Sequence, residues 1–166
     1  MEAKKTGISR DLIIHPGETI ADILNERGIS QAELAMRADV SAAYVSNVIS
    51  GKKNISAKFA MNLEYALGVP KSFWLNLQAN YDAELLEYNE MQTITDEERM
   101  ICSKLSAIVK DLQAREILPP EESQEKSILS MRKIFHISNI RNLNKVYKTC
   151  GFDSALVEEL RLALCD

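Results

Sequence analysis

The chain has 166 residues, of which 46% are hydrophobic and 27% are charged, a balance typical of a folded globular protein and not of a disordered one. No apolar run approaches the ~20 residues needed to cross a bilayer, and the N-terminus lacks the apolar segment of a secretory signal. The formal net charge is −4, but residues 27–58 hold five basic and two acidic side chains, whereas residues 81–125 hold four basic and twelve acidic ones. An acidic total therefore does not exclude a basic DNA-binding face.

The cysteines are Cys102, Cys150 and Cys165, which are few, far apart and odd in number. They form no CxxC pair and indicate neither a disulfide framework nor a zinc site. We therefore expect a cytoplasmic protein without metal or other cofactor.

The first half of the chain predicts an arm followed by five helices. Residues 1–14 form the arm. A helix is expected over 15–28, because Pro16 suits a first helical position and Gly28 suits a helix end. Ser residues then precede three further helices as N-caps, and the fifth begins at Pro70. Those caps are Ser30, Ser41 and Ser56.

After Tyr88 the composition changes, although helical periodicity continues. Thr95 and Glu98 have the spacing of a capping box, and an amphipathic helical stripe follows at Ile101, Leu105, Ile108 and Leu112. Further helices are expected over 122–137, 138–149 and 154–164. No alternating strand pattern of useful length occurs. The sequence predicts an all-α chain with an arm (1–14), a five-helix domain (15–89) and a helical C-terminal extension (90–166).

The second and third helices have the pattern of a helix-turn-helix. Small or apolar residues occupy the positions where two helices cross steeply, and Ala35 matters most because a bulky side chain there would push the helices apart. Asp39 stands where the chain needs a left-handed turn, which Asp tolerates better than most residues. The remaining positions of the set are Leu34, Ala38, Val40, Val45 and Val48. In this arrangement the third helix projects outward and fits the major groove of DNA.

The candidate DNA contacts fall into two groups. Asn47 can pair bidentately with adenine, serine hydroxyls can bond bases or phosphate, and small or aromatic side chains can meet thymine methyl groups. The base-reading candidates are Ser41, Ala42, Ala43, Tyr44, Ser46 and Asn47. The phosphate candidates are Gln31, at the start of the second helix, and Lys52, Lys53 and Asn54, after the third.

Three stretches together resemble the HigA antitoxins, a branch of the Xre-type repressors. They are IIHPGETIADIL, SQAELAMRADVSAAYVSNVISGKKNIS and LGVPKSFWLNLQANYD, and the likeness covers about residues 13–85. The HPGE opening and the FWLNLQ..YD ending are more specific than the helix-turn-helix. The resemblance implies a lambda-repressor-like five-helix domain, a homodimer on a palindromic double-stranded operator and repression of its own operon. It also implies a RelE-like mRNA-cleaving toxin that the chain neutralises.

Two features leave alternatives open. Trp74, Leu77 and Tyr81 fit either core packing of the fifth helix or a dimer interface. The extension is long for an antitoxin, and RKIFHIS (132–138) faintly resembles the connecting region of repressors fused to an ImmA/IrrE-type peptidase. That peptidase needs HExxH, whereas His15 and His136 are isolated, so we expect no enzyme. The alternative function is a stand-alone Xre-type regulator that senses a ligand or protein signal, or works with a separate peptidase.

Overall fold

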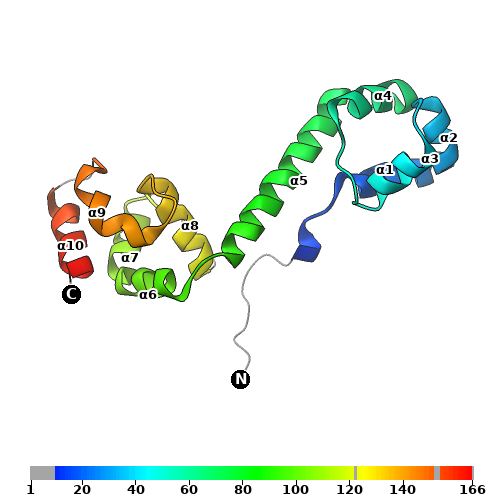
Figure 1. Cartoon of the computed structure of the whole chain (residues 1–166). Coiled ribbons are helices and arrows are strands. Elements are labelled where there is room, and N and C mark those ends of the chain that lie inside the picture. Colours follow the sequence, from blue (N-terminus) through cyan, green and yellow to red (C-terminus); the bar gives the residue numbers. More distant parts are fainter. Residues whose placement is uncertain (1–9, 122, 152–153, 166) are drawn as a thin grey trace. The chain divides into compact units, whose positions relative to one another are not determined.

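The computed structural model describes residues 10–121, 123–151 and 154–165, and within them the chain forms helices and turns only (Figure 1). In chain order the elements are η1 (Arg10–Leu12), α1 (Pro16–Arg27), α2 (Gln31–Arg37), α3 (Ala42–Ile49), α4 (Ala57–Leu67), α5 (Lys71–Gln92), α6 (Asp96–Lys104), α7 (Ser106–Ala114), α8 (Gln124–Ile134), η2 (Ile140–Asn142), α9 (Leu143–Val146), η3 (Tyr147–Thr149) and α10 (Ser154–Cys165). The all-α expectation is confirmed. Of the expected arm, the structure describes residues 10–14, and residues 1–9 lie outside the described part.

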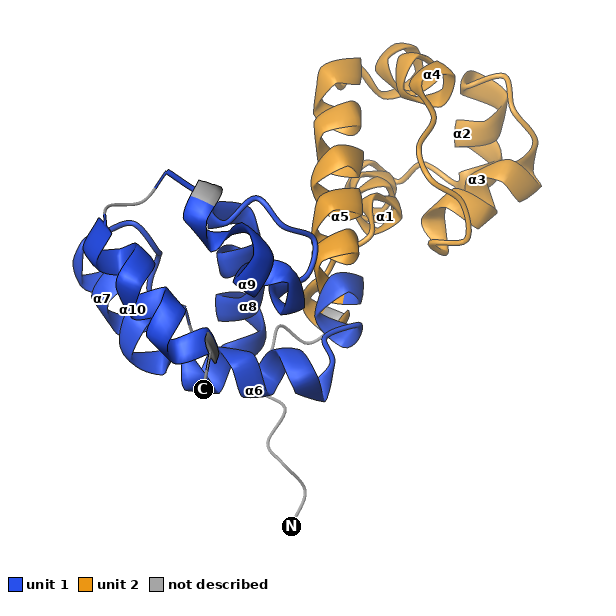
Figure 2. Cartoon of the chain, turned by 60° about the vertical axis from the view of Figure 1, so that its left-hand side comes forward, with its two compact units in different colours: residues 1–8, 89–166 blue, residues 9–88 orange. Residues whose placement is uncertain are grey.

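The helices form two compact units, one within residues 9–88 and the other within residues 89–166 (Figure 2). We call them the N-terminal unit and the C-terminal unit. Each has its own cluster of buried apolar side chains. The long helix α5 contributes Trp74 to the first cluster and Met91 to the second.

Serine caps begin three helices of the N-terminal unit, as the sequence predicts. The hydroxyl oxygens of Ser30, Ser41 and Ser56 each accept the backbone N–H three residues ahead at 3.1 Å. Such a cap stabilises a helix by about 1 kcal/mol. Gly28 and Gly68 end α1 and α4 in the left-handed conformation, with φ of 64° and 69°. These signals set where α2, α3 and α4 begin and where α1 and α4 end.

The core of the N-terminal unit is formed where α1 to α5 face one another. Its largest side chains are fully buried, and they come from every one of these helices. They include Ile20, Leu34, Val48, Phe59, Leu63 and Trp74. Because α3 contributes Val45 and Val48 to this core, one side of α3 is fixed against α1 and α2 while the other side remains at the surface.

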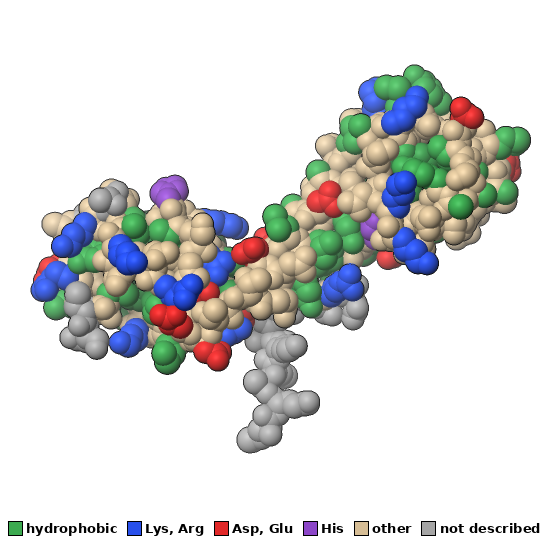
Figure 3. All heavy atoms as spheres, viewed as in Figure 1, with side chains coloured by type: hydrophobic (Ala, Val, Ile, Leu, Met, Phe, Trp, Pro, Cys, Tyr) green, Lys and Arg blue, Asp and Glu red, His purple; other side chains and the backbone are tan. Residues whose placement is uncertain are grey.

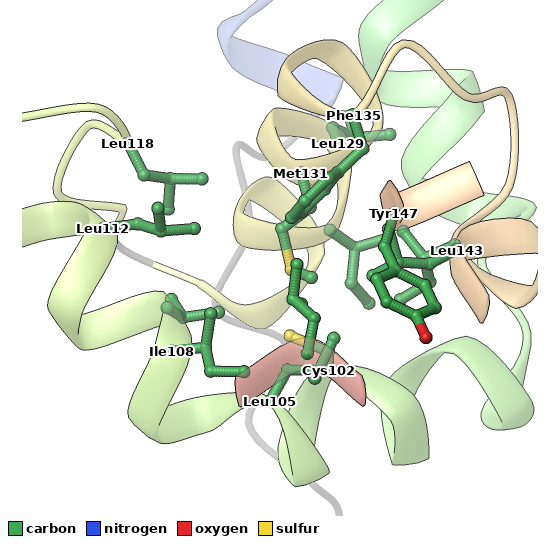
Figure 4. Close-up of a cluster of buried hydrophobic side chains, with 14 of the residues drawn as sticks. Cys102, Leu105, Ile108, Leu112, Leu118, Leu129, Met131, Phe135, Leu143 and Tyr147 are labelled. Carbon is green, nitrogen blue, oxygen red and sulfur yellow. The ribbon is translucent and has the colours of Figure 1, made fainter. Parts of the chain in front are cut away.

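The C-terminal unit has a larger apolar core, supplied mainly by α6, α7, α8, α9 and α10 (Figure 4). Leu105, Leu112, Phe135 and Leu143 are each at most 1% exposed. Thr95 and Glu98 form the reciprocal capping box that their spacing predicts, and α6 begins there.

The expected stripe from Ile101 to Leu112 is carried by two helices instead of one. The break lies at Leu105, between α6 and α7. The Ser103 hydroxyl donates to the carbonyl of Arg99, and the Gln124 amide donates to the same carbonyl and to the Ser103 oxygen. Side-chain bonds to carbonyls one turn back bend a helix at this kind of position. The bend lets both halves place apolar side chains in the same core.

A buried ion pair crosses the C-terminal unit from α6 to α8. Glu98 is fully buried, and its carboxylate accepts hydrogen bonds from the Arg132 guanidinium at 2.8 and 3.0 Å and from the backbone N–H of Thr95 and Ile140. Burial alone would raise the pKa of Glu98, but these bonds outweigh it and hold the pKa below its usual value. Arg132 also donates to Glu90 at 3.2 Å.

The surface of the C-terminal unit mixes charges of both signs. In Figure 3, basic and acidic side chains are interspersed on the visible face of this unit. Arg141 pairs with Glu97 at 3.3 Å, and Arg161 pairs with Glu158 at 2.6 Å. Ion pairs of this exposed kind indicate a solvated helical surface.

Candidate nucleic-acid interface

The helix α3 presents a small, polar outer face. Its first turn is fixed by Ser41, which caps the backbone N–H of Tyr44, and its inner side is fixed by Val45 and Val48, at most 1% exposed. The outward residues are Ser41, Ala42, Ala43, Ser46 and Asn47, all of them exposed. Because none of these side chains is large, the backbone of α3 can approach a flat or grooved partner closely.

Tyr44 differs from the expectation that it points freely outward, because it is half-buried. Its ring packs edge-on against Phe59 of α4, with centroids 5.0 Å apart, and its hydroxyl lies 3.5 Å from the Ser56 oxygen. The ammonium of Lys53 lies 4.2 Å from the centre of the Tyr44 ring, within cation–π range. Tyr44 thus connects α3 to α4 through Phe59 and to the loop after α3 through Lys53.

The turn between α2 and α3 has the geometry that the sequence predicts. Ala35 and Ala38 are buried where the two helices cross, and Asp39 has a left-handed backbone with φ of 51°. The side-chain amide of Asn62 on α4 donates to the Ala38 carbonyl at 2.9 Å. The angle between α2 and α3 is therefore held from the turn and from α4.

The HPGE stretch forms the surface on which the C-terminal end of α3 rests. Nδ1 of His15 accepts the Gly17 N–H at 2.9 Å and so caps α1. A methyl group added at Gly17 would lie 2.2 Å from the Val48 carbonyl oxygen and 2.8 Å from the Ile49 Cα. Only glycine permits this approach of α1 to α3.

The lysine loop, residues 51–55, follows the C-cap of α3. The backbone N–H groups of Lys52 and Lys53 both donate to the Asn47 carbonyl, at 2.9 and 3.1 Å, and both side chains are exposed. Asn54 has a different environment, because its amide donates to Asp82 of α5 at 3.3 Å. This bond anchors the loop to α5; the Asn54 side chain is exposed, and its contact with phosphate stays a prediction.

Gln31, a candidate for phosphate contact, is the first residue of α2 and is exposed.

The candidate interface residues for a dimer have three different environments. Trp74 is completely buried, and its indole N–H donates to the Val69 carbonyl at 3.2 Å, so it is a core residue and not an interface residue. Leu77 is partly buried against the same core, and Tyr81 is half-buried. Leu77 and Tyr81 keep some accessible surface.

Sequence reasoning missed the roles of His15, Gln78 and Asp82. All three belong to the two specific motifs, HPGE and FWLNLQ..YD, but no role could be assigned to them from spacing. His15 is 8% exposed, and burial lowers the pKa of its imidazole, against the opposing influence of Asn54, Asp82 and Glu18. Gln78 is 6% exposed and accepts the Ile55 N–H at 2.8 Å. For Gln78 the available signal was a polar residue on the otherwise apolar face of α5, which indicates a buried hydrogen bond.

Among the described residues, no group of three or more His, Cys, Asp or Glu side chains is placed to hold a metal ion. Over the same residues, no helix is both long and apolar enough to span a bilayer. Cys102 and Cys150 are free thiols, and the Cys165 side chain lies outside the described part.

Residues 20–74 match the helix-turn-helix family model. Virulence-associated protein A' of Dichelobacter nodosus is 45% identical over 69 residues, which cover 41% of this chain and 60% of that protein. Virulence-associated protein I of the same organism is 31% identical over 78 residues, covering 46% and 72%. The immunity repressor protein of Bacillus phage phi105 is 28% identical over 135 residues, covering 79% of this chain and 90% of the repressor.

Similar solved structures include antitoxins. The Pseudomonas aeruginosa antitoxin HigA, solved with the higBA promoter, is 32% identical, with a TM-score of 0.46, and the match covers 50% of this chain and 96% of that one. An addiction module antidote protein of a HigA family from Coxiella burnetii is 30% identical, with a TM-score of 0.45 and coverage of 49% and 95%. On the family model and the relatives, the chain belongs to the Xre-type helix-turn-helix family of DNA-binding regulators.

Proposed function

We propose that this chain is a sequence-specific repressor that inserts α3 into the major groove of an operator. The observation that carries the proposal is the exposed face of α3, small and polar, held over Val45 and Val48. On this face Asn47 reads adenine, and hydroxyl or methyl groups meet the neighbouring bases. The proposed base-reading residues are Ser41, Ala42, Ala43, Ser46 and Asn47. Tyr44 supports this face from its half-buried position.

The phosphate contacts surround the reading helix. Gln31 at the start of α2 and Lys52 and Lys53 after α3 are all exposed, so their side chains can reach the DNA backbone on either side of the groove. The lysines supply the counterion-releasing part of the affinity, which depends on salt and not on sequence.

A homodimer would place two copies of α3 on a palindromic operator. We propose that α5 supplies the contact between the copies. Leu77 and Tyr81, which are partly buried, would lie at the edge of this contact. Phe73 and Leu75 on the same helix are 44% and 38% exposed and give it apolar surface. The first operator to test is the DNA upstream of the chain's own reading frame, because the resemblance to the HigA antitoxins implies repression of its own operon.

The direct experiment is a titration of the full chain against a duplex from that upstream region, with a shuffled duplex of equal composition as the control. We expect preferential binding by ~10³-fold or more, the range of specific over non-specific recognition. Equal affinity for both duplexes would contradict operator recognition.

For the protein partner we propose a cognate RelE-like toxin, neutralised by complex formation. This proposal is supported by the HPGE and FWLNLQ..YD motifs and by the antitoxin names of similar proteins. A second candidate is a stand-alone repressor whose C-terminal unit receives a signal. It is favoured by the match to the phage repressor, which extends over 79% of this chain and so reaches into the C-terminal unit.

Co-expression separates the two candidates. The chain would be produced with the product of the adjacent reading frame, followed by purification and a growth assay. A stable complex with a neighbour that is toxic alone supports the antitoxin. A neighbour that is harmless and does not co-purify contradicts it and leaves the signal-receiving repressor.

A further inference from the structure

Two motifs that are far apart in the sequence meet beside the lysine loop. Gln78 and Asp82 lie one turn apart on α5, and the Gln78 amide donates to the Asp82 carboxylate at 2.9 Å. The Gln78 carbonyl oxygen accepts the Ile55 N–H at 2.8 Å, and the Asp82 carboxylate accepts the Asn54 amide at 3.3 Å. Two successive loop residues are thus bound by two successive turns of α5.

The HPGE motif supports the other end of the same loop. A methyl group added at Gly51 would lie 3.5 Å from the Cγ of His15, and the imidazole packs edge-on against the ring of Tyr81, with centroids 4.7 Å apart. His15 is therefore wedged between the start of the loop and α5.

The lysine loop is consequently fixed at both ends while its lysine side chains stay exposed. At its beginning, the N–H groups of Lys52 and Lys53 bond to the Asn47 carbonyl, which belongs to the reading helix. At its end, Asn54 and Ile55 bond to α5. A loop whose charged residues are held before the partner arrives loses less conformational entropy when it binds.

We propose that Gln78 and Asp82 are positioning residues for DNA recognition: they hold the lysine loop so that Lys52 and Lys53 reach the operator phosphates, and they do this without contacting DNA. This inference rests on the proposed insertion of α3 into the major groove. It assigns a function to the Gln and Asp of the FWLNLQ..YD motif that neither the helix-turn-helix pattern nor charge alone requires.

The direction in which removal of Asp82 changes the DNA affinity distinguishes positioning of the loop from simple electrostatics. Asp82 carries a negative charge close to a phosphate-binding loop, so its removal should strengthen DNA binding if charge alone matters. If Asp82 positions the loop, its removal should weaken binding. Glu84 is an exposed acidic residue two positions further along α5, and Glu84→Ala provides the matched change in charge.

The experiment titrates the upstream duplex with the full chain and with Asp82→Ala, Asp82→Asn and Glu84→Ala over a series of salt concentrations. We expect Asp82→Ala to lower the affinity about 3- to 10-fold, the scale of one ordinary hydrogen bond, and to reduce the salt slope by about one. Asp82→Asn, whose amide oxygen still accepts from Gln78, should bind at least as tightly as the wild type, and Glu84→Ala should not weaken binding.

A double-mutant cycle tests whether Asn54 and Asp82 act on DNA binding through the same contact. If Asn54 acts through Asp82, Asn54→Ala and Asp82→Ala together should weaken binding no more than either alone. Additive losses, or an Asp82→Ala variant that binds as tightly as Glu84→Ala, would overturn the inference. A wild-type chain that shows no preference for the upstream duplex would instead overturn the proposed function. Fluorescence of Trp74 would verify in each variant that the N-terminal unit is folded.

Discussion

The imidazole of His15 and the phenol ring of Tyr81 meet edge-to-face, with centroids 4.7 Å apart and an interplanar angle of 78°. One ring comes from the residue that caps α1, and the other comes from the middle of α5. This contact joins the two most specific motifs of the chain behind the lysine loop. Neither motif contributes to the outer face of the helix-turn-helix.

Gly17→Ala should destabilise the N-terminal unit. The added methyl group would lie 2.2 Å from the Val48 carbonyl oxygen, which is backbone and cannot rotate away. Overpacking of this kind costs about 1–3 kcal/mol. Thermal unfolding followed by Trp74 fluorescence measures it, because Trp74 is the only tryptophan and is buried in this unit. Asp22→Ala, an exposed change on the same helix, is the control, and equal melting temperatures for the two variants would contradict the close approach.

The stability of the N-terminal unit should decrease as the pH falls from 7.5 to 5. Burial lowers the pKa of His15 from 6.5, so the unfolded chain binds more protons in this range than the folded one. The contribution of a neutral His15 to the free energy of unfolding is fully present above pH 6.5 and is lost as the pH falls through the lower pKa of the folded state. Protonation of Nδ1 would also break the cap on Gly17.

The test compares unfolding curves from Trp74 fluorescence across this pH range. His15→Asn, which can still cap α1, should remove most of the pH dependence above pH 5. His136→Asn is the matched control, because His136 is exposed and belongs to the C-terminal unit. A pH dependence that survives in His15→Asn and disappears in His136→Asn would refute this assignment.

Glu98→Gln should destabilise the C-terminal unit by about 3–5 kcal/mol, because it leaves the Arg132 guanidinium, with a side chain only 10% exposed, without its main anionic partner. The neighbouring Glu97→Gln removes an exposed pair with Arg141 and should cost at most about 1 kcal/mol. Hydrogen exchange of the backbone amides in α6 and α8 measures the loss of stability in each of the two variants. Similar protection in the two variants would show that the buried pair does not stabilise this unit.

Local signals in the sequence predicted most of the helices because the chain marks their ends chemically. Ser41 and Ser56 cap where they were expected, and Asp39 adopts the left-handed turn between α2 and α3. The Leu105 break was not predictable from periodicity, and one of the bonds beside it comes from Gln124, a residue of another helix that donates to the Arg99 carbonyl. Periodicity alone describes a continuous stripe there.

The candidate site was predictable where it depends on one helix and less so where it depends on contacts across the fold. The exposed positions of α3 follow from its period of 3.6 residues. Tyr44 is less outward than expected because its packing depends on Phe59. The bond from Asn54 to Asp82 was not predictable, because the two residues are distant in the sequence. Trp74 had two interpretations in the sequence, and its complete burial decides for the core.

The central claim is that α3 reads bases while the lysine loop contacts phosphates. The most direct measurement compares Asn47→Ala and Lys53→Ala in titrations against the upstream duplex, a set of single base-pair variants of it, and a shuffled duplex, each over several salt concentrations. Asn47→Ala should cost about 1–3 kcal/mol and relax the preference at one base pair, with an unchanged salt slope. Lys53→Ala should weaken binding to all duplexes alike and reduce the slope by about one. Equal loss of sequence preference in both variants would contradict this division of roles.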